Sequence, residues 1–136
     1  MENADKIKKE LLSQAHTIAV VGLSPDPEKA SNIVANYLIA NNYQVVPVNP
    51  GREEILGRRS YPSLRDIPDK VDIVDIFMRS ERVLPVVIEA ITLKPRAIWL
   101  QLGILDNEAR DLAESNNILF FMDKCIKLEH ARLFHA

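Results

Sequence analysis

Five short apolar runs alternate along the chain with segments whose apolar residues recur at helical spacing, and this alternation constrains the fold most. The run Thr-Ile-Ala-Val-Val at 17–21 is continuous and rich in β-branched residues, as expected for a strand covered on both faces. The predicted strands are 17–21, 44–48, 71–77, 97–102 and 118–122, and the predicted helices are 4–13, 30–41, 83–91, 106–115 and 126–134. Such alternation produces βαβ units and a parallel sheet. The sequence therefore predicts an α/β fold, a Rossmann-like, doubly wound, five-stranded parallel sheet in three layers, with strand order 3-2-1-4-5.

The length and charge of the chain restrict the classes of protein to which it can belong. Its 136 residues fit a single domain, predicted to span 1–136 with 1–14 as an N-terminal helical extension. Seventeen basic against nineteen acidic residues give a net charge of −2, without the basic excess typical of proteins that bind nucleic acid or anionic membranes. One cysteine excludes an intramolecular disulfide, and no apolar run approaches the roughly 20 residues of a spanning helix. We expect a cytoplasmic protein with a small-molecule ligand.

Three of the four glycines fall in loops that follow predicted strands, where a ligand is expected. In open α/β sheets, ligands bind beyond the carboxyl ends of the strands, at the point where the strand order reverses. A glycine there lets the backbone approach a ligand or adopt a positive φ, although each glycine alone also fits a simple turn. The loops are 22–24, 49–51, 77–79, 101–103 and 122–125.

The first loop, Gly22-Leu23-Ser24, leads into the helix predicted from Ala30, and this arrangement suits a phosphate. The free N–H groups and the positive dipole end of a helix attract anions. Ser24 and Ser31 could add hydroxyl donors and Lys29 a charge. An ordinary first-turn residue at Ser31 and a solvated Lys29 are the alternative interpretations.

The same loop departs from the dinucleotide pattern G-x-G-x-x-G. Ser24 and Pro27 occupy the positions of the second and third glycines. The acidic residue expected after the second strand is also absent, since the chain reads Val48-Asn49-Pro50. Both recognition devices for NAD are therefore missing, and an NAD(P)-dependent oxidoreductase is the weaker alternative.

The loop Phe77-Met78-Arg79 offers an aromatic ring for a base and a cation for a phosphate. Packing of Phe77 in the core and a solvated Arg79 are the competing interpretations.

Asp106 and Asp123 are expected to cap the last two helices. The sequence contains no metal-ligand spacing, nucleophile elbow, P-loop or paired-carboxylate motif, so we predict no catalytic residue.

The sequence of these loops resembles the small stand-alone CoA-binding domain family of bacteria and archaea. The matching segments run in the right order and spacing from about residue 17 to residue 133. They are 18–25, 46–50, 61–64 with 67–68, 71–77, 99–104 and 122–130. The family is similar to the CoA-binding domain of the succinyl-CoA synthetase α subunit, whose phosphohistidine and ligase machinery has no counterpart here.

The resemblance implies binding of coenzyme A or an acyl-CoA, without evident catalysis. It places the pyrophosphate at Gly22, Leu23, Ser24 and the following helix start, with Lys29 and Ser31 nearby. Asn49 and Pro50 with Phe77, Met78 and Arg79 would flank the adenosine, and Gln101, Leu102, Gly103 and Ile104 would line the side of the fourth strand. A protein partner of unknown identity is compatible with a module of this kind.

Cys125 provides a further alternative, a thiol role in which it forms a mixed disulfide with CoA. It precedes the last predicted helix, with Lys124 and Lys127 nearby, and both features favour the thiolate. A buried, inert cysteine is the competing interpretation.

Overall fold

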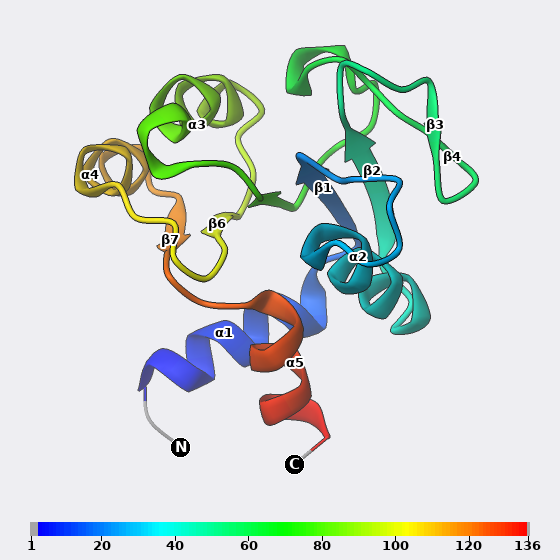
Figure 1. The fold of residues 1–136 in the computed structure, drawn as a ribbon. Helices are drawn as coiled ribbons and strands as arrows, with labels where there is room; N and C mark the ends of the chain where they lie inside the picture. The colour runs from blue at the N-terminus through cyan, green and yellow to red at the C-terminus, as the bar shows by residue number, and fades with distance from the viewer. Residues whose placement is uncertain (1–2, 136) are drawn as a thin grey trace.

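A computed structural model of the chain describes residues 3–135, and every predicted helix and strand is present with ends within two residues of those predicted. The helices are α1 (Asn3–Gln14), α2 (Ala30–Ala40), α3 (Val83–Thr92), α4 (Asn107–Ser115) and α5 (Ile126–Phe134). The strands are β1 (Thr17–Val21), β2 (Gln44–Val48), β3 (Glu54–Ile55), β4 (Arg58–Arg59), β5 (Ile73–Ile76), β6 (Ala97–Leu100) and β7 (Leu119–Phe121). Figure 1 shows their course along the chain. The hairpin of β3 and β4 lies between the predicted strands 44–48 and 71–77, where no helix or strand was predicted.

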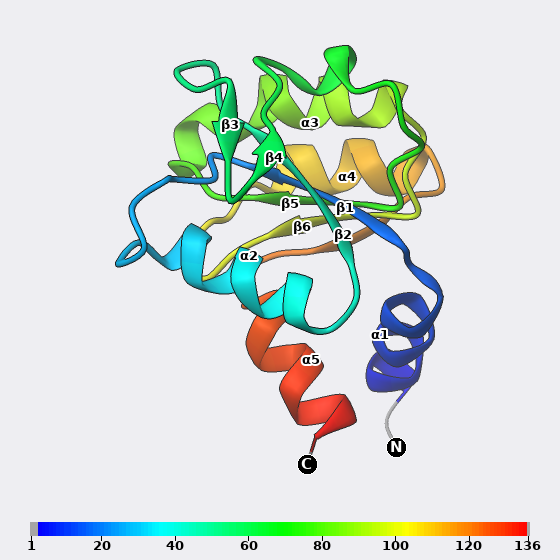
Figure 2. The same cartoon turned by 90° about the vertical axis from the view of Figure 1, so that its right-hand side faces the viewer.

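The main sheet is parallel, in the order β2-β1-β5-β6-β7, and helices cover both of its faces. Figure 2 shows α3 and α4 on one face and α1, α2 and α5 on the other. One core lies beneath α3 and α4 and includes Val74 and Ile76, whereas the opposite core includes Ile73 and Trp99. Successive residues of β5 thus point to opposite faces. The predicted three-layer, Rossmann-like α/β fold is confirmed.

The predicted strand order 3-2-1-4-5 is wrong. The third predicted strand, β5, pairs with β1 rather than with β2. The place beyond β2 is taken by Tyr61, which forms an isolated parallel bridge with Val48. The Tyr61 N–H donates to the carbonyl of Pro47, and the Asn49 N–H donates to the carbonyl of Tyr61. Because the chain passes from β1 outward to β2 and then back to β5, the reversal of strand order lies between β1 and β5.

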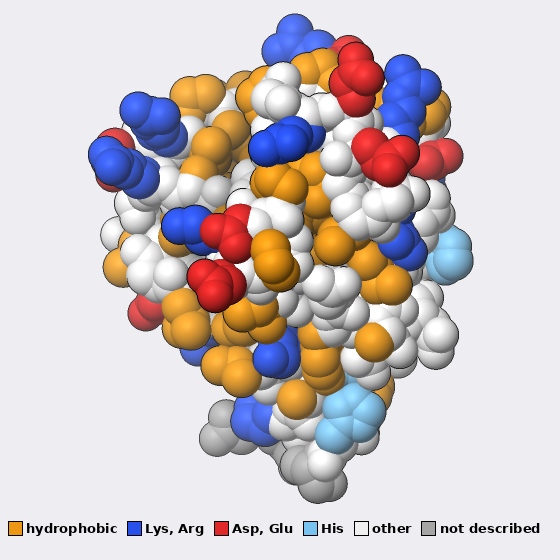
Figure 3. Space-filling model, turned by 45° about the vertical axis from the view of Figure 1, so that its right-hand side comes forward, with side chains coloured by type: hydrophobic (Ala, Val, Ile, Leu, Met, Phe, Trp, Pro, Cys, Tyr) orange, Lys and Arg blue, Asp and Glu red, His pale blue; other side chains and the backbone are white. Residues whose placement is uncertain are grey.

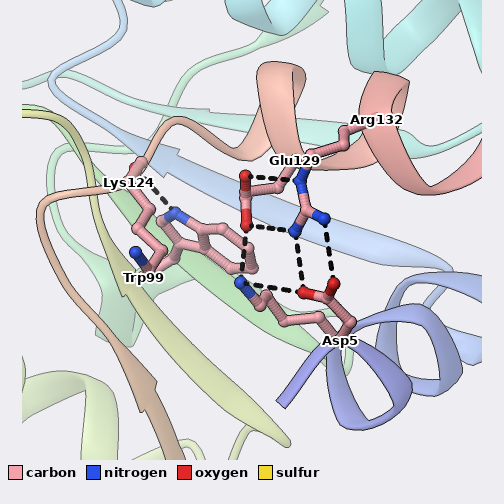
Figure 4. Close-up of polar contacts among 6 residues, drawn as sticks. Asp5, Trp99, Lys124, Glu129 and Arg132 are labelled. Atoms are coloured by element: carbon pink, nitrogen blue, oxygen red, sulfur yellow. Dashed lines mark hydrogen bonds and ion pairs between the residues drawn. The ribbon is translucent and has the colours of Figure 1, made fainter. Parts of the chain in front are cut away.

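Helices α1 and α5 lie side by side although they are far apart in sequence, and ion pairs join them (Figure 4). Lys8 on α1 is buried, and its ammonium group donates to Glu129 on α5 at 2.5 Å. Arg132 donates through two nitrogens to Asp5 at 2.8 and 2.9 Å, and its hydrogen bonds lower the pKa of that carboxyl. Leu11 and Leu12 of α1 are buried in the core beside α2 and α5. Helix α1 therefore contributes to the core as well as to these ion pairs.

Candidate functional site

Gly22 occupies the point where the strand order reverses, immediately after β1. Its N–H donates to the carbonyl of Val48 on one side, while the Phe77 N–H donates to the carbonyl of Val21 on the other. Gly22 has a φ of +82°, and a Cβ atom at this position would lie 2.1 Å from the carbonyl oxygen of Phe77. No side chain fits in that space, so the close approach of the two backbones requires glycine here.

A cavity of about 380 Å³ opens on the α3 side of Gly22, and we call it the α3-side cavity. Four of the predicted binding residues line it: Gly22, Asn49, Pro50 and Met78. The other lining residues are Val21, Val48, Pro62, Ser63, Leu64, Val86 and Glu89. The walls are mainly apolar, with a few polar groups, and such a lining is typical of small-molecule sites.

A second cavity of about 230 Å³, the α5-side cavity, lies on the opposite face of the sheet. Its predicted binding residues are Phe77, Met78, Gln101, Leu102 and Ile104, and Cys125, Ala30 and Val34 complete it. Met78 lines both cavities, so the two meet at the end of β5. Ala30 is the first residue of α2, which brings the amino end of that helix to the α5-side cavity.

Hydrogen bonds within the loop between β1 and α2 engage Ser24 and Ser31, whose hydroxyl oxygens act there as acceptors of backbone N–H groups. The Ser24 N–H donates to the hydroxyl of Ser31 at 2.9 Å, and the Asn32 side chain donates to the Ser24 carbonyl. Leu23 is buried in the core, and its carbonyl accepts a hydrogen bond from the Asn49 side chain. Lys29 is exposed at the N-cap position of α2. These contacts fix the loop that the sequence assigns to a phosphate.

The loops after β6 and β7 are fixed to one another and place Cys125 at the wall of the α5-side cavity. Gln101 is buried, and its side-chain oxygen accepts the N–H of Ile126, the first residue of α5. The prediction that Asp123 caps α5 is therefore wrong, because this carboxylate instead accepts the N–H of Gly103 at 2.7 Å. The indole N–H of Trp99 donates to the carbonyl of Lys124 (Figure 4). The predicted cap at Asp106 is confirmed by its bond to the Ala109 N–H.

Of the fourteen predicted residues, eight line the two cavities and six do not. Arg79 and Gly103 are exposed beside the site, and neither has a side chain or backbone segment in either cavity wall. The residues outside the two linings are Leu23, Ser24, Lys29, Ser31, Arg79 and Gly103.

Sequence reasoning missed a wide depression of about 710 Å³ that adjoins the α3-side cavity and shares Pro50 and Pro62 with it. Arg52 and Arg59 lie in its wall, and the Arg59 guanidinium stands 5.2 Å from the ring centroid of Tyr61. Its remaining residues are Gly51, Glu53, Glu54 and Ser60. Leu56-Gly57, between short segments that pair as β3 and β4, is the turn signal that could have revealed this hairpin.

The positive charges of Arg52 and Arg59 are matched in the same depression by the negative charges of Glu53 and Glu54. The face drawn in Figure 3 carries basic and acidic side chains interspersed among hydrophobic ones. Within residues 3–135, no three histidine, cysteine, aspartate or glutamate side chains gather as a metal ion would require. Over the same residues, every helix is too short or too polar to cross a bilayer.

Asp75 lies in the middle of β5, fully buried, with Val20 and Trp99 as its neighbours in the sheet. Neither carboxyl oxygen has a hydrogen-bond partner. Burial without a compensating partner raises the pKa of Asp75 well above its usual value. Residues two apart in a strand point to the same face of the sheet, so Asp75 lies on the same face as Phe77. Phe77 lines the α5-side cavity, and Asp75 is two residues before it.

A comparison with known protein families assigns residues 16–131 to the family described as CoA binding domain. The chain belongs to the CoA binding domain family. The predicted resemblance is thereby confirmed. The uncharacterized protein YneT of Bacillus subtilis is 36% identical over 132 residues, which cover 96% of this chain and 98% of that protein. An ADP-forming acetate–CoA ligase of Methanocaldococcus jannaschii is 24% identical over 131 residues, but the match spans only 18% of the ligase.

Solved structures of similar size have the same fold as this CoA binding domain chain. A hypothetical protein from Pyrococcus horikoshii superposes with a TM-score of 0.92 and 40% identity, covering 95% of this chain and 91% of its own. A protein from Thermus thermophilus gives a TM-score of 0.93 and 36% identity, covering 98% and 100%. The parallel sheet and its flanking helices are therefore shared along nearly the whole chain.

Proposed function

We propose that this chain binds coenzyme A or an acyl-CoA at the carboxyl ends of β1, β2, β5 and β6, without a reaction of its own. The observation that carries the proposal is the pair of cavities that meet at Met78, on either side of the strand reversal, in a chain of the CoA binding domain family. A ligand with a base at one end and a flexible arm at the other matches two adjoining cavities better than a compact metabolite does.

In this proposal the adenosine occupies the α3-side cavity, beside Asn49 and Pro50. The pyrophosphate lies at Gly22 and the amino end of α2, where free N–H groups and the helix dipole favour an anion. The pantetheine arm then follows the α5-side cavity past Phe77 and Gln101. The 3′-phosphate, which distinguishes CoA from its dephospho form, points toward Arg52 and Arg59.

Titration calorimetry tests the proposal with CoA, acetyl-CoA, dephospho-CoA, NAD⁺ and NADP⁺. We expect CoA to bind and dephospho-CoA to bind more weakly. Replacing Arg52 and Arg59 together with alanine should weaken CoA binding by about tenfold or more, since hydrogen bonds to charged groups contribute about 1.5–3 kcal/mol. The same double variant should affect dephospho-CoA far less.

Arg110→Ala serves as the matched control, because Arg110 lies on α4 and pairs with Asp111 away from both cavities. Its CoA affinity should equal that of the unaltered protein. Clear binding of NAD⁺ with no binding of CoA would rule the proposal out and favour the oxidoreductase alternative.

A mixed disulfide between Cys125 and CoA is the second candidate function, favoured by the position of Cys125 in the wall of the α5-side cavity. In this step the Cys125 thiolate attacks one sulfur of CoA disulfide. The disulfide bond breaks, one CoA leaves as its thiolate, and the other remains bonded to Cys125. The exchange needs no oxidant beyond the CoA disulfide itself.

Intact-mass spectrometry after incubation with CoA disulfide should show one added CoA on the unaltered protein and none on Cys125→Ser. A thiol reductant should remove the adduct. If the unaltered protein binds CoA by calorimetry yet acquires no adduct, the thiol role is excluded and simple CoA binding remains.

A further inference from the structure

Glu89 presents a carboxylate to the α3-side cavity and is the charged side chain among its lining residues. It lies on α3, with 19% of its side chain exposed. One oxygen accepts the Leu64 N–H at 2.8 Å, and the other accepts two guanidinium nitrogens of Arg65 at 2.8 and 3.2 Å. The carboxylate is thus held in one orientation from two sides.

The other polar side chains of this cavity already have partners. The Asn49 amide group donates to the Leu23 carbonyl and accepts the Gly51 N–H, and the Ser63 hydroxyl donates to Asp66. A carboxylate oxygen has two lone pairs, so the Glu89 oxygen that accepts the Leu64 N–H can accept one further hydrogen bond, whereas the oxygen that faces Arg65 already accepts two. Glu89 is therefore the charged acceptor in the wall, with one oxygen that has capacity to accept a hydrogen bond from a ligand.

The remaining walls suit a flat, uncharged ring. Val48, Pro50, Pro62, Leu64 and Met78 surround the space with apolar surface. A planar heterocycle could occupy this space and place its polar edge against Glu89. The edge that a carboxylate favours carries N–H donors, whereas a carbonyl oxygen at the same position would bring two sets of lone pairs together.

We infer that Glu89 is a specificity-determining residue that accepts a hydrogen bond from the 6-amino group of an adenine and selects against 6-oxo purines. The inference rests on the proposed function, since it assigns the α3-side cavity to the base of CoA. Adenine carries an amino group at position 6, and hypoxanthine carries a carbonyl oxygen there. A polar group built to bond a ligand amine discriminates strongly because a ligand lacking that amine leaves the group unpaired.

The test compares CoA with desamino-CoA, in which hypoxanthine replaces adenine, by titration calorimetry. The unaltered protein should bind desamino-CoA about tenfold or more weakly than CoA, as expected for loss of a hydrogen bond to a charged acceptor. In Glu89→Gln the ratio should fall toward one, because the glutamine amide can either accept from an amine or donate to a carbonyl. Glu108→Gln, an exposed position on α4, is the matched control and should keep the original ratio.

The outcomes separate this inference from the proposal on which it rests. Equal binding of CoA and desamino-CoA by the unaltered protein overturns the role of Glu89 and leaves CoA binding intact. Tighter binding of desamino-CoA also overturns it, because Glu89 would then face the N1–H of the ring. Thermal unfolding of Glu89→Gln checks that the Leu64 contact survives the substitution. If the unaltered protein binds no CoA, both the proposed function and the inference fail.

Discussion

Gly22→Ala should lower the free energy of unfolding by roughly 3 kcal/mol, the largest effect that we expect from alanine at any of the four glycines. Two costs combine at this position. The φ of +82° is unfavourable for a residue with a side chain, and the new methyl carbon would lie 2.1 Å from the Phe77 carbonyl oxygen. The neighbouring atom belongs to backbone just beyond β5, held by the hydrogen bond from the Phe77 N–H to the Val21 carbonyl, so it cannot rotate away as a flexible side chain could. Urea unfolding followed by circular dichroism measures the change.

Gly57→Ala isolates the clash from the backbone strain. Gly57 also has a positive φ, +72°, but no atom lies within 4 Å of the position that its Cβ would take. Its substitution should cost only about 1 kcal/mol. Equal losses in the two variants would show that the sheet relaxes around residue 22 and that the close approach of β1 and β5 is not fixed. A larger loss at Gly22 supports the rigid junction between the two cavities.

Asp75→Asn should become progressively more stable than the unaltered protein as the pH rises above about 4, the ordinary pKa of an aspartate. Burial raises the pKa of Asp75 in the folded state, so the folded chain retains a proton that the unfolded chain releases. Stability contributed by that proton is present at low pH and is lost as the pH rises toward the folded pKa. The slope approaches about 1.4 kcal/mol per pH unit over this window. The asparagine side chain does not titrate, so the stability of the variant does not fall with rising pH for this reason.

Urea titrations of both proteins at pH 4.5, 5.5 and 7 provide the measurement. Subtracting one stability curve from the other cancels the remaining groups, including His130, whose pKa is lowered by burial. Asp69→Asn, the same substitution at an exposed position, is the control. A flat difference for Asp75→Asn would mean that water or a local rearrangement solvates the buried acid.

The secondary structure could be predicted from the sequence because continuous apolar strands and amphipathic helices have distinct periods. The strand order could not, since the pairing of β5 with β1 joins segments far apart in the sequence and leaves no periodic pattern in it. A long segment without a predicted element, followed by a strand, is compatible with pairing beside β2 or beside β1. In the structure Tyr61 forms a bridge at the outer edge of β2, and β5 pairs with β1.

Only part of the candidate site could be predicted, because the rest also depends on contacts between residues far apart in the sequence. Residues immediately after strands, such as Asn49 and Met78, could be placed at the carboxyl edge by topology alone, and they line a cavity. Glu89 lies on a helix and Arg59 on the hairpin of β3 and β4, outside the loops that follow the strands of the main sheet, and they reach the same region only through tertiary packing. The role of Gln101 as the cap of α5 likewise depends on a contact between residues 25 positions apart.

Trp99 is the one tryptophan of the chain, and its indole is fully buried, with the ring of Phe121 at 4.7 Å between centroids. Its N–H donates a hydrogen bond to the carbonyl of Lys124, the residue that precedes Cys125. The protein therefore carries its own optical probe next to the α5-side cavity, and no dye or label is needed. Indole emission shifts to longer wavelength when the ring meets water, so its spectrum follows the opening of this region separately from the α3 side of the sheet.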